Sequence, residues 1–471
     1  MKRILPVGLL ALLMACATKT YVAPEVQTPP AFKESGDWKP GEPADAVLRG
    51  TWWEVFDDEQ LNQLESQIAV SNQALKQAQA RFEDARASVR GARSALYPQV
   101  AVAPSVVWAK PSGNRAVSPF HGNYADLLLP ASVTYEADVW GRIRNSVEAS
   151  RTAAQSTAAD LELANLSLHA ELAVDYFLLR GFDRERELLD SAVSAYERAL
   201  ELTQNRFLGG LASQADVAFA ETQLETTRAQ AVDIGVARSA VEHAIAVLLG
   251  LPAASFSLPP ATGPHTPPAI PVGLPSDLLE RRPDIASAER RVASANAHVG
   301  VTSAAFYPIF ALTGLGGFES SSLGNWITGL SSFWTIGPSA IITVLDGGKR
   351  RAASAQAKAQ YEEASAEYQQ SVLVALQEVE DQLSALRILS EEAAIQQRAV
   401  DAAERSLQQA TLRYRGGLVS YLEVAVAQSV ALQNERVAVG LLTRRMTSSV
   451  LLIKGLGGGW NVATLPTVDN Q

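Results

Sequence analysis

Two kinds of hydrophobic periodicity alternate along this chain of 471 residues. In four short segments, apolar residues occupy every second position, which is the period of a β-strand with two different faces. The segments follow Tyr97-Pro98, continue around Ser132 to Val139, and return at Ile309 to Phe318 and Trp334 to Leu345. We therefore predict four strands, joined in pairs by the Gly-, Ser- and Asn-rich loops 109–123 and 319–333.

The segments around the strands follow a heptad pattern instead. Apolar positions from Leu386 to Tyr414 alternate in spacings of three and four, interrupted only by the polar Gln396. Residues 179–207 lie 207 positions earlier and have the same register. Because no proline interrupts residues 141–206, a helix there would be about 100 Å long. The pattern predicts coiled-coil helices that are too long for a compact globular domain.

The two halves of the chain repeat one another. The segment Arg81–Pro98 matches Arg291–Pro308, and both end in Tyr-Pro. Farther on, Arg-Phe-Leu-Gly-Gly-Leu-Ala-Ser from Arg206 matches Arg-Tyr-Arg-Gly-Gly-Leu-Val-Ser from Arg413. A tandem duplication of one strand-and-helix unit explains both matches.

A proline-rich linker separates these halves, because no helix or central strand tolerates the seven prolines between positions 259 and 275. The linker, the repeats and the N-terminal leader described below define the domain boundaries that we predict. They are a signal peptide at 1–15, a lipidated N-terminal arm at 16–55, a first repeat at 56–255, the linker at 256–277, a second repeat at 278–460 and a C-terminal tail at 461–471.

The N-terminus has the features of a lipoprotein leader. Lys2 and Arg3 precede an apolar run that is too short to span a bilayer, and Leu-Met-Ala-Cys ends at Cys16. We predict cleavage before Cys16 and a lipid on its thiol; the alternative is an ordinary secretory leader with a chance cysteine. Since Cys16 is the only cysteine, no intramolecular disulfide can form.

Composition narrows the possible functions. Hydrophobic residues make up 47% of the chain and charged residues 19%, which is typical of a folded protein with a large core. The net charge of -10 argues against nucleic acid as a partner. The five histidines show no metal-ligand spacing and no paired nucleophile motif. We therefore expect no enzyme activity, no metal and no cofactor apart from the covalent lipid on Cys16.

Strands in a membrane must close into a barrel, and four strands are too few. Two copies would give eight strands with a filled interior, whereas three would give twelve and leave a lumen. The strands alone leave a second interpretation open, a soluble sheet on a periplasmic coiled-coil protein. Trp108, Trp326 and Trp334 near the strand ends suit either a membrane-interface girdle or a core.

Several unusual strings occur in order around the duplication. They are Trp52-Trp53-Glu-Val-Phe56-Asp-Asp58-Glu-Gln-Leu61-Asn-Gln-Leu64, Leu274-Pro-Ser-Asp277-Leu-Leu-Glu-Arg281-Arg282-Pro283-Asp284-Ile285, Asp138-Val-Trp140-Gly141-Arg142 and Asp346-Gly-Gly348-Lys349. On these residues, nearly the whole mature chain resembles outer membrane factors of the TolC/OprM type, and among them the NodT-like outer membrane efflux lipoproteins. The resemblance implies a mostly α-helical fold with a small β part, in which a homotrimer forms a twelve-stranded barrel and a periplasmic α-helical tunnel.

The function implied by the resemblance is passive export of small molecules, such as drugs or other toxic compounds, across the outer membrane. A periplasmic adaptor (membrane fusion) protein and an inner-membrane pump, commonly of the resistance-nodulation-division (RND) type, would supply the substrate and the energy. The alternative is a structural or adaptor-type periplasmic coiled-coil lipoprotein. For an adaptor we would expect one hairpin and no duplicated strand pairs.

Two sets of residues resemble functional positions of the family. The paired tips look like adaptor-docking turns and comprise Arg206, Gly209, Gly210, Leu211, Arg413, Gly416, Gly417 and Leu418. Each glycine pair also lets two helices reverse direction. Asp216 and Glu423 would form two acidic rings at a periplasmic constriction, although Val426 stands where the family often has another acid. Ser213 with Asp216, and Ser420 with Glu423, also fit capping boxes at helix starts.

Overall fold

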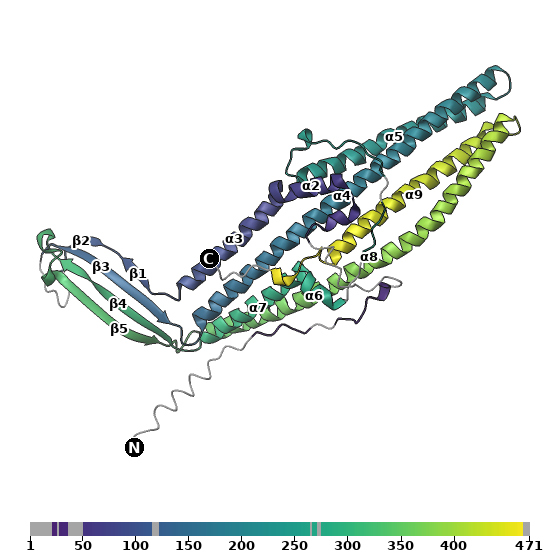
Figure 1. Cartoon of the computed structure of the whole chain (residues 1–471). Coiled ribbons are helices and arrows are strands. Elements are labelled where there is room, and N and C mark those ends of the chain that lie inside the picture. The colour runs from purple at the N-terminus through teal and green to yellow at the C-terminus, as the bar shows by residue number, and fades with distance from the viewer. Residues whose placement is uncertain are drawn as a thin grey trace.

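The structure, a computed structural model, describes residues 21–25, 28–35, 50–114, 122–263, 266–270 and 275–464. The molecule is elongated, with a β-sheet at one end and the tips of two helical hairpins at the other (Figure 1). The predicted signal peptide and Cys16 lie outside the described residues, as do residues 465–471 of the tail.

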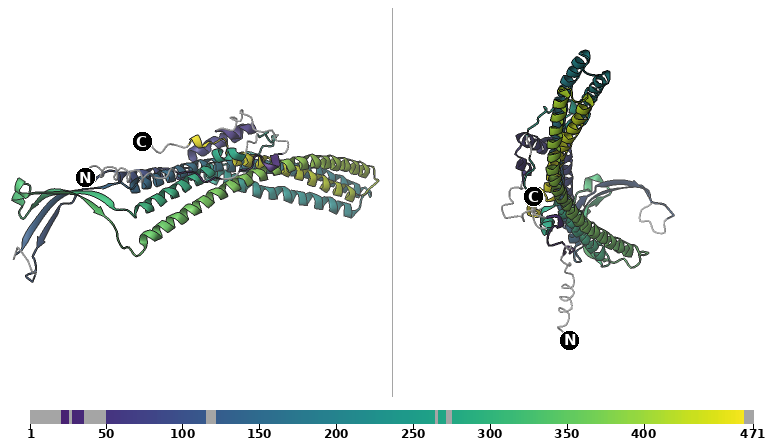
Figure 2. Two further views of the ribbon diagram at one scale, coloured as in Figure 1. Left: turned by 90° about the horizontal axis from the view of Figure 1, so that it is seen from below. Right: turned by 90° about the vertical axis from the view of Figure 1, so that its right-hand side faces the viewer.

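Two helical hairpins form the long axis of the molecule. The first contains α4 (Arg142–Leu208) and α5 (Gln214–Leu248), and the second contains α8 (Lys349–Arg415) and α9 (Tyr421–Gly455). Both α4 and α8 have 67 residues, which corresponds to about 100 Å. The hairpins lie side by side, with α4 packed against α9 (Figures 1 and 2). The predicted uninterrupted helices are therefore confirmed.

Shorter helices lead into the strands and the hairpins. They are α2 (Glu59–Ser71), α3 (Gln73–Ser94), α6 (Leu278–Arg281) and α7 (Pro283–Ala304). The 3₁₀ turns are η1 (Lys33–Ser35), η3 (Trp52–Phe56), η4 (Ala253–Ser255), η5 (Pro275–Asp277), η6 (Leu323–Asn325), η7 (Gly329–Ser331) and η8 (Val462–Thr464). Helix α3 packs along α4, while α7 packs between α4 and α8. Both α3 and α7 are followed by a Tyr-Pro pair and then by a strand, as the repeat predicts.

The strands form one antiparallel sheet. They are β1 (Gln99–Val102), β2 (Ser105–Ala109), β3 (Tyr124–Ala137), β4 (Ile309–Ser320) and β5 (Ser332–Ile341), in the order β1-β3-β4-β5 with β2 also on β3. The prediction of one unbroken first strand was wrong. Pro104 has no N–H to donate, so the strand divides into β1 and β2, which continue in the same register along β3.

The predicted end of the last strand was also wrong, by four residues. It ends at Ile341 instead of Leu345, because Ile341 pairs with Ile309, the first residue of β4. No residue of β4 is left to pair with the positions that follow.

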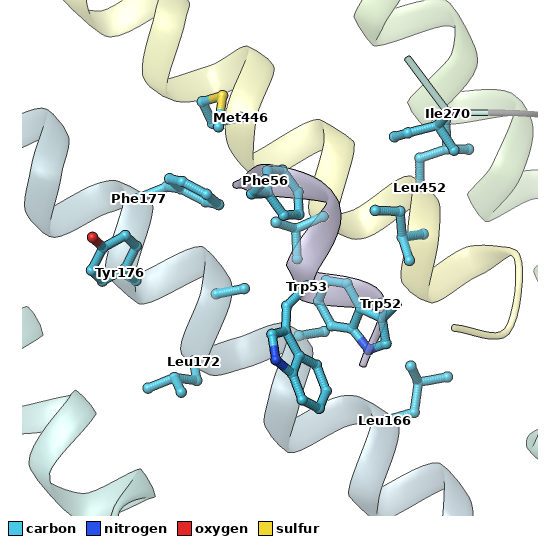
Figure 3. Packing of buried hydrophobic residues seen from close by; sticks show 14 of the residues in the cluster. Trp52, Trp53, Phe56, Leu166, Leu172, Tyr176, Phe177, Ile270, Met446 and Leu452 are labelled. Atoms are coloured by element: carbon cyan, nitrogen blue, oxygen red, sulfur yellow. The ribbon is translucent and has the colours of Figure 1, made fainter. Parts of the chain in front are cut away.

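The largest core lies where the two halves of the chain meet. Trp52, Trp53 and Phe56 of η3 are buried between α4 and α9 (Figure 3). The apolar face of α2 and the C-terminal part of α9 belong to the same cluster. This core fixes the N-terminal segment to both hairpins at about the middle of the molecule (Figure 1).

Most of the predicted heptad seam is buried. In the second half it buries Leu386, Leu389, Val400, Ala403, Ala410 and Tyr414. In the first half the prediction was wrong at Arg186 and Phe207, whose side chains are exposed. Arg186 instead pairs with Asp190 at 2.8 Å and donates a hydrogen bond to the carbonyl of Ala231, so it ties α4 to α5 from the surface.

Candidate functional site

The sheet has one apolar face and one mostly polar face. Residues directly opposite one another on paired strands share a face, so Val133, Gly314 and Ile336 lie in one row. The large exposed side chains of this apolar face are Val100, Val102, Val106, Trp108, Val133, Phe310, Leu312, Trp334 and Ile336. A water-soluble sheet would bury such a face in a core.

The other face carries mostly small and polar side chains, together with a few large apolar ones such as Val107, Leu315 and Ile341. Its polar side chains are Gln99, Ser105, Asp126, Ser132, Thr134, Glu136, Thr313, Glu319, Thr335 and Ser339. Glu136 forms a two-fold hydrogen-bonded ion pair with Arg142, with distances of 2.9 and 2.7 Å. This pair joins the end of β3 to the start of α4, so it fixes the direction in which the long helix leaves the sheet.

Aromatic residues mark both ends of the sheet. Trp108 and Trp334 lie on the apolar face at the end far from the helices, and their side chains are 79% and 80% exposed. At the other end, Trp140 stacks on Tyr307 with 4.7 Å between ring centroids. Trp334 is opposite Gly316, nine positions beyond Tyr307, which places the two levels roughly 30 Å apart along the strand. Trp326, in contrast, is half-buried in the connection between β4 and β5.

Both edges of the sheet are open. Among the described residues, no strand pairs with the outer side of β1 and β2 or with the outer side of β5. Each edge therefore presents unpaired backbone N–H and carbonyl groups, which favour pairing with another chain.

At the opposite end of the molecule, both hairpins turn in the same way. Gly210 and Gly417 have φ of 71° and 75°, a left-handed conformation that glycine adopts without strain. The N–H of Leu211 donates to the carbonyl of Arg206 at 2.7 Å, and Leu418 donates to Arg413 at 2.9 Å. The predicted glycine-pair turns are confirmed as helix ends. The two leucines project from the tips and are 73% and 75% exposed.

The two predicted capping boxes have different outcomes. Ser213 and Asp216 form one at the start of α5, with backbone-to-side-chain distances of 2.9 and 3.1 Å. The prediction for the second hairpin was wrong, since the side chain of Ser420 makes no capping hydrogen bond. Glu423 points back across the hairpin and pairs with Arg413 at 2.6 Å instead.

Asp216 also connects the two hairpins, a role that the sequence did not indicate. Its Oδ1 accepts a hydrogen bond from the backbone N–H of Tyr421 at 3.1 Å. Although partial burial opposes ionisation, the hydrogen bonds from Ser213 and Tyr421 and the charge of Arg206 hold the pKa of Asp216 below its usual range. The carboxylate is therefore charged at neutral pH.

A second link between the hairpins comes from Arg206. Its Nη1 donates to the carbonyl of Tyr414 at 2.9 Å, and its guanidinium lies over the ring of that tyrosine, 4.6 Å from the centroid. With the bond from Tyr421 to Asp216, this contact forms what we call the tip latch, defined by Arg206, Asp216, Tyr414 and Tyr421. The latch joins the end of the first hairpin to the end of the second.

Beside the latch, a groove of about 510 Å³ runs between α8 and α9. Arg413, Ser420 and Glu423 form its polar part, while Leu422 and Val426 form part of its apolar lining. Both of these apolar side chains are about half exposed.

Within the described ranges, no group of three or more His, Cys, Asp or Glu side chains is arranged to hold a metal ion. None of the helices described has an apolar stretch of the length and character needed to cross a membrane.

Two regions of the chain, residues 64–251 and 274–458, match the model of the family described as outer membrane efflux protein. Together they make up more than half of the chain. The chain belongs to this family. Each matched region contains strands of the sheet and one long helical hairpin. The proline-rich segment lies between the two regions. The resemblance to outer membrane factors is thus confirmed.

Individual relatives agree with the family match. The chain is 29% identical to the antibiotic efflux pump outer membrane protein ArpC of Pseudomonas putida over 444 residues, which cover 93% of this chain and 92% of ArpC. It is 28% identical to the outer membrane protein OprJ of Pseudomonas aeruginosa over 458 residues, covering 95% and 94% of the two chains. The solved structure of the outer-membrane channel OprN matches with a TM-score of 0.85 and 30% identity, over 93% of this chain and 99% of OprN. The mostly helical fold with a small β part is therefore confirmed.

Proposed function

We propose that this chain is the outer-membrane channel subunit of a tripartite efflux system, through which small molecules such as drugs or other toxic compounds leave passively. One observation carries the proposal: a sheet with one apolar face and two open edges continues into hairpins about 100 Å long. The names of its relatives support it, since ArpC is an antibiotic efflux pump outer membrane protein and OprN is an outer-membrane channel.

Three copies would close the sheet. Counting β1 and β2 as one broken strand, each chain contributes four strands, so a homotrimer has twelve. The open edge of β5 in one copy would pair with the edge of β1 and β2 in the next, leaving no backbone group unpaired in lipid. Eight strands from two copies would enclose only packed side chains.

The two faces give this barrel its orientation. The apolar face would contact lipid, and the aromatic levels roughly 30 Å apart along the tilted strands fit an apolar band about 25 Å high. Mostly small and polar side chains would line the lumen. The hairpins would then extend into the periplasm as a tunnel.

At the far end of this tunnel, the tips are suited to an adaptor. Arg206, Gly209, Gly210 and Leu211, with Arg413, Gly416, Gly417 and Leu418, form two similar turns with an exposed leucine on each. We propose that a periplasmic adaptor docks here and connects the channel to an inner-membrane pump of the RND type. The chain itself would use no energy and catalyse no reaction.

Asp216 and Glu423 would each occur three times around the periplasmic mouth of a trimer. Their charges are partly compensated, because Asp216 accepts hydrogen bonds in the tip latch and Glu423 pairs with Arg413. We propose that both acids belong to the closed constriction, Asp216 as part of the latch and Glu423 as a charge beside the groove.

The N-terminal anchor and the domain boundaries remain part of the proposal. The mature chain would begin with lipidated Cys16 in the outer membrane, and the arm to residue 55 would precede the two repeats 56–255 and 278–460, which the linker 256–277 separates. The alternative, a structural or adaptor-type periplasmic coiled-coil lipoprotein, does not account for an apolar sheet face on a duplicated pair of hairpins.

The proposed function is tested with purified full-length protein. Light scattering corrected for bound detergent should give three chains per particle, because closing the barrel pairs every strand edge. In planar lipid bilayers the same sample should conduct ions in discrete steps. A monodisperse monomer or dimer, or a trimer that never conducts, would contradict the channel.

The lipid anchor has its own test. Replacing Cys16 by Ser should abolish incorporation of radioactive palmitate, since the thiol is the predicted acylation site, while the trimer still reaches the outer membrane through its barrel. Label on the mutant protein would refute the lipid assignment. Loss of the mutant from the outer membrane would show that insertion depends on the anchor.

A further inference from the structure

A carboxyl group and an imidazole form an isolated buried pair in the central core. Glu65 of α2 lies on the helix face that carries Leu61 and Ile68, and its side chain is completely buried. Its Oε2 is 2.6 Å from Nδ1 of His169 on α4, whose side chain is 7% exposed. On one side, the ring of Trp53 stacks on the imidazole with 4.4 Å between centroids. Figure 3 shows Trp53 directed against α4 within this core.

The surroundings favour an uncharged pair over an ion pair. The second carboxyl oxygen of Glu65, Oε1, is buried and has no hydrogen-bond partner in the described part of the chain. A carboxylate there would lose its hydration without compensation, whereas a carboxylic acid can donate its proton to Nδ1. Burial accordingly raises the pKa of Glu65 to about 9 and lowers the pKa of His169 to about 4.

No nearby charge contributes to either shift. The charged side chains nearby along the chain are Glu54, Asp57, Asp58 and Glu59 around η3 and the start of α2, Asp160, Glu162, Glu171 and Asp175 on α4, and Lys454 at the end of α9. Asp58 accepts hydrogen bonds from the hydroxyl of Tyr176 and from the backbone of Leu61. The protonation of the pair is therefore determined by whether this core is closed.

We infer that Glu65 and His169 form a pair that shares one proton and holds η3 and α2 against α4, and that this attachment weakens as the pH rises above neutrality. The segment concerned connects the N-terminal arm to the two hairpins, so the device acts on the attachment of the arm and is separate from the pore. The closed pair holds one proton, on the carboxyl, and both partners are neutral.

The direction of the pH effect follows from the protons bound in each state. In an opened segment, Glu65 titrates near 4.5 and His169 near 6.5. Between these values the open form also holds one proton, on the imidazole, so stability does not change with pH. Above 6.5 the open form loses that proton while the closed pair keeps its own until about 9, so stability falls across this window as the pH rises. Below 4.5 the open form binds a second proton, so stability falls again until the closed pair also binds one near pH 4.

Hydrogen exchange of the full chain in detergent tests this device. Between pH 6.5 and pH 9, after correction for the chemical exchange rate, the opening constant of residues 52–71 should rise by up to about tenfold per pH unit. Glu65→Gln should remove this dependence, because the amide donates to Nδ1 at every pH. The matched control Glu59→Gln, at an exposed position six residues earlier on α2, should keep it. The inference is wrong if Glu65→Gln and the parent show the same pH dependence.

A second measurement needs no variant. In ¹⁵N-histidine spectra of the parent protein, one of the five rings should remain neutral at pH 5, with its proton on Nε2, because Nδ1 accepts the bond from Glu65. Five imidazolium signals at pH 5 would show an ordinary ion pair and would overturn the inference even if Glu65→Gln failed to fold.

Discussion

Arginine at position 312 should eliminate the trimer from the outer membrane, whereas arginine at position 313 should leave it in place. Leu312 lies on the apolar face of β4, and its side chain is 42% exposed. It is five positions beyond Tyr307 and four before Gly316, the partner of Trp334, so it lies about midway between the two aromatic levels. An arginine facing the middle of the bilayer costs about 2–4 kcal/mol per copy, and a trimer contains three. Thr313 is on the opposite face, where an arginine would enter the lumen.

The measurement is the amount of heat-sensitive trimer in outer-membrane fractions of cells that produce each variant at equal levels. The two substitutions introduce the same side chain at neighbouring positions of one strand, so a difference reports which face contacts lipid. If Thr313→Arg is lost and Leu312→Arg persists, the faces are reversed. If both persist, the sheet does not lie in the membrane.

The alternation in the sequence predicted this two-faced sheet because successive strand residues point to opposite sides. It could not give the pairing of β3 with β4, where Val133 and Gly314 are partners 181 positions apart. Register over such a separation depends on the long helices that return the chain to the sheet. The break at Pro104, by contrast, could have been predicted, because a proline cannot donate a ladder hydrogen bond.

At the tips, local signals were sufficient for some features and misleading for others. The glycine pairs predicted both turns because only the backbone conformation is involved. The prediction of a capping box at Ser420 was wrong because the carboxylate of Glu423 pairs with Arg413, ten positions earlier in the chain. The bond from Tyr421 to Asp216 spans 205 positions and had no local signal.

The buried pair in the central core was also missed. The spacing of the five histidines along the chain shows no pattern and so gives no sign of the pair. A usable signal was Glu65 itself, an acid on the same helix face as Leu61 and Ile68. An ionisable residue in an apolar stripe needs a buried partner. The sequence could indicate that need, but only the structure identifies His169 as the partner.

The second large effect concerns closure of the periplasmic mouth. Asp216→Asn should raise the current through the closed channel in lipid bilayers, because the amide has one acceptor oxygen in place of the two that now receive Ser213 and Tyr421. Loss of the cap and of a charge-assisted hydrogen bond should destabilise the closed state by about 1 kcal/mol per copy, which lowers the equilibrium constant for closing about fivefold. Three independent copies would together change it by about 100-fold.

Two further variants separate the tip latch from charge alone. Asp233→Asn removes the same charge from an exposed position about 25 Å farther along α5 and should conduct like the parent. Glu423→Gln breaks the pair with Arg413 inside the second hairpin but leaves the bond from Tyr421 to Asp216, so it should change ion preference more than closed-state current. If Asp216→Asn stays closed while Glu423→Gln opens, the contact within the second hairpin holds the mouth shut. The link between the hairpins would then only fix the register of the two tips, because its loss would leave the closed state unchanged.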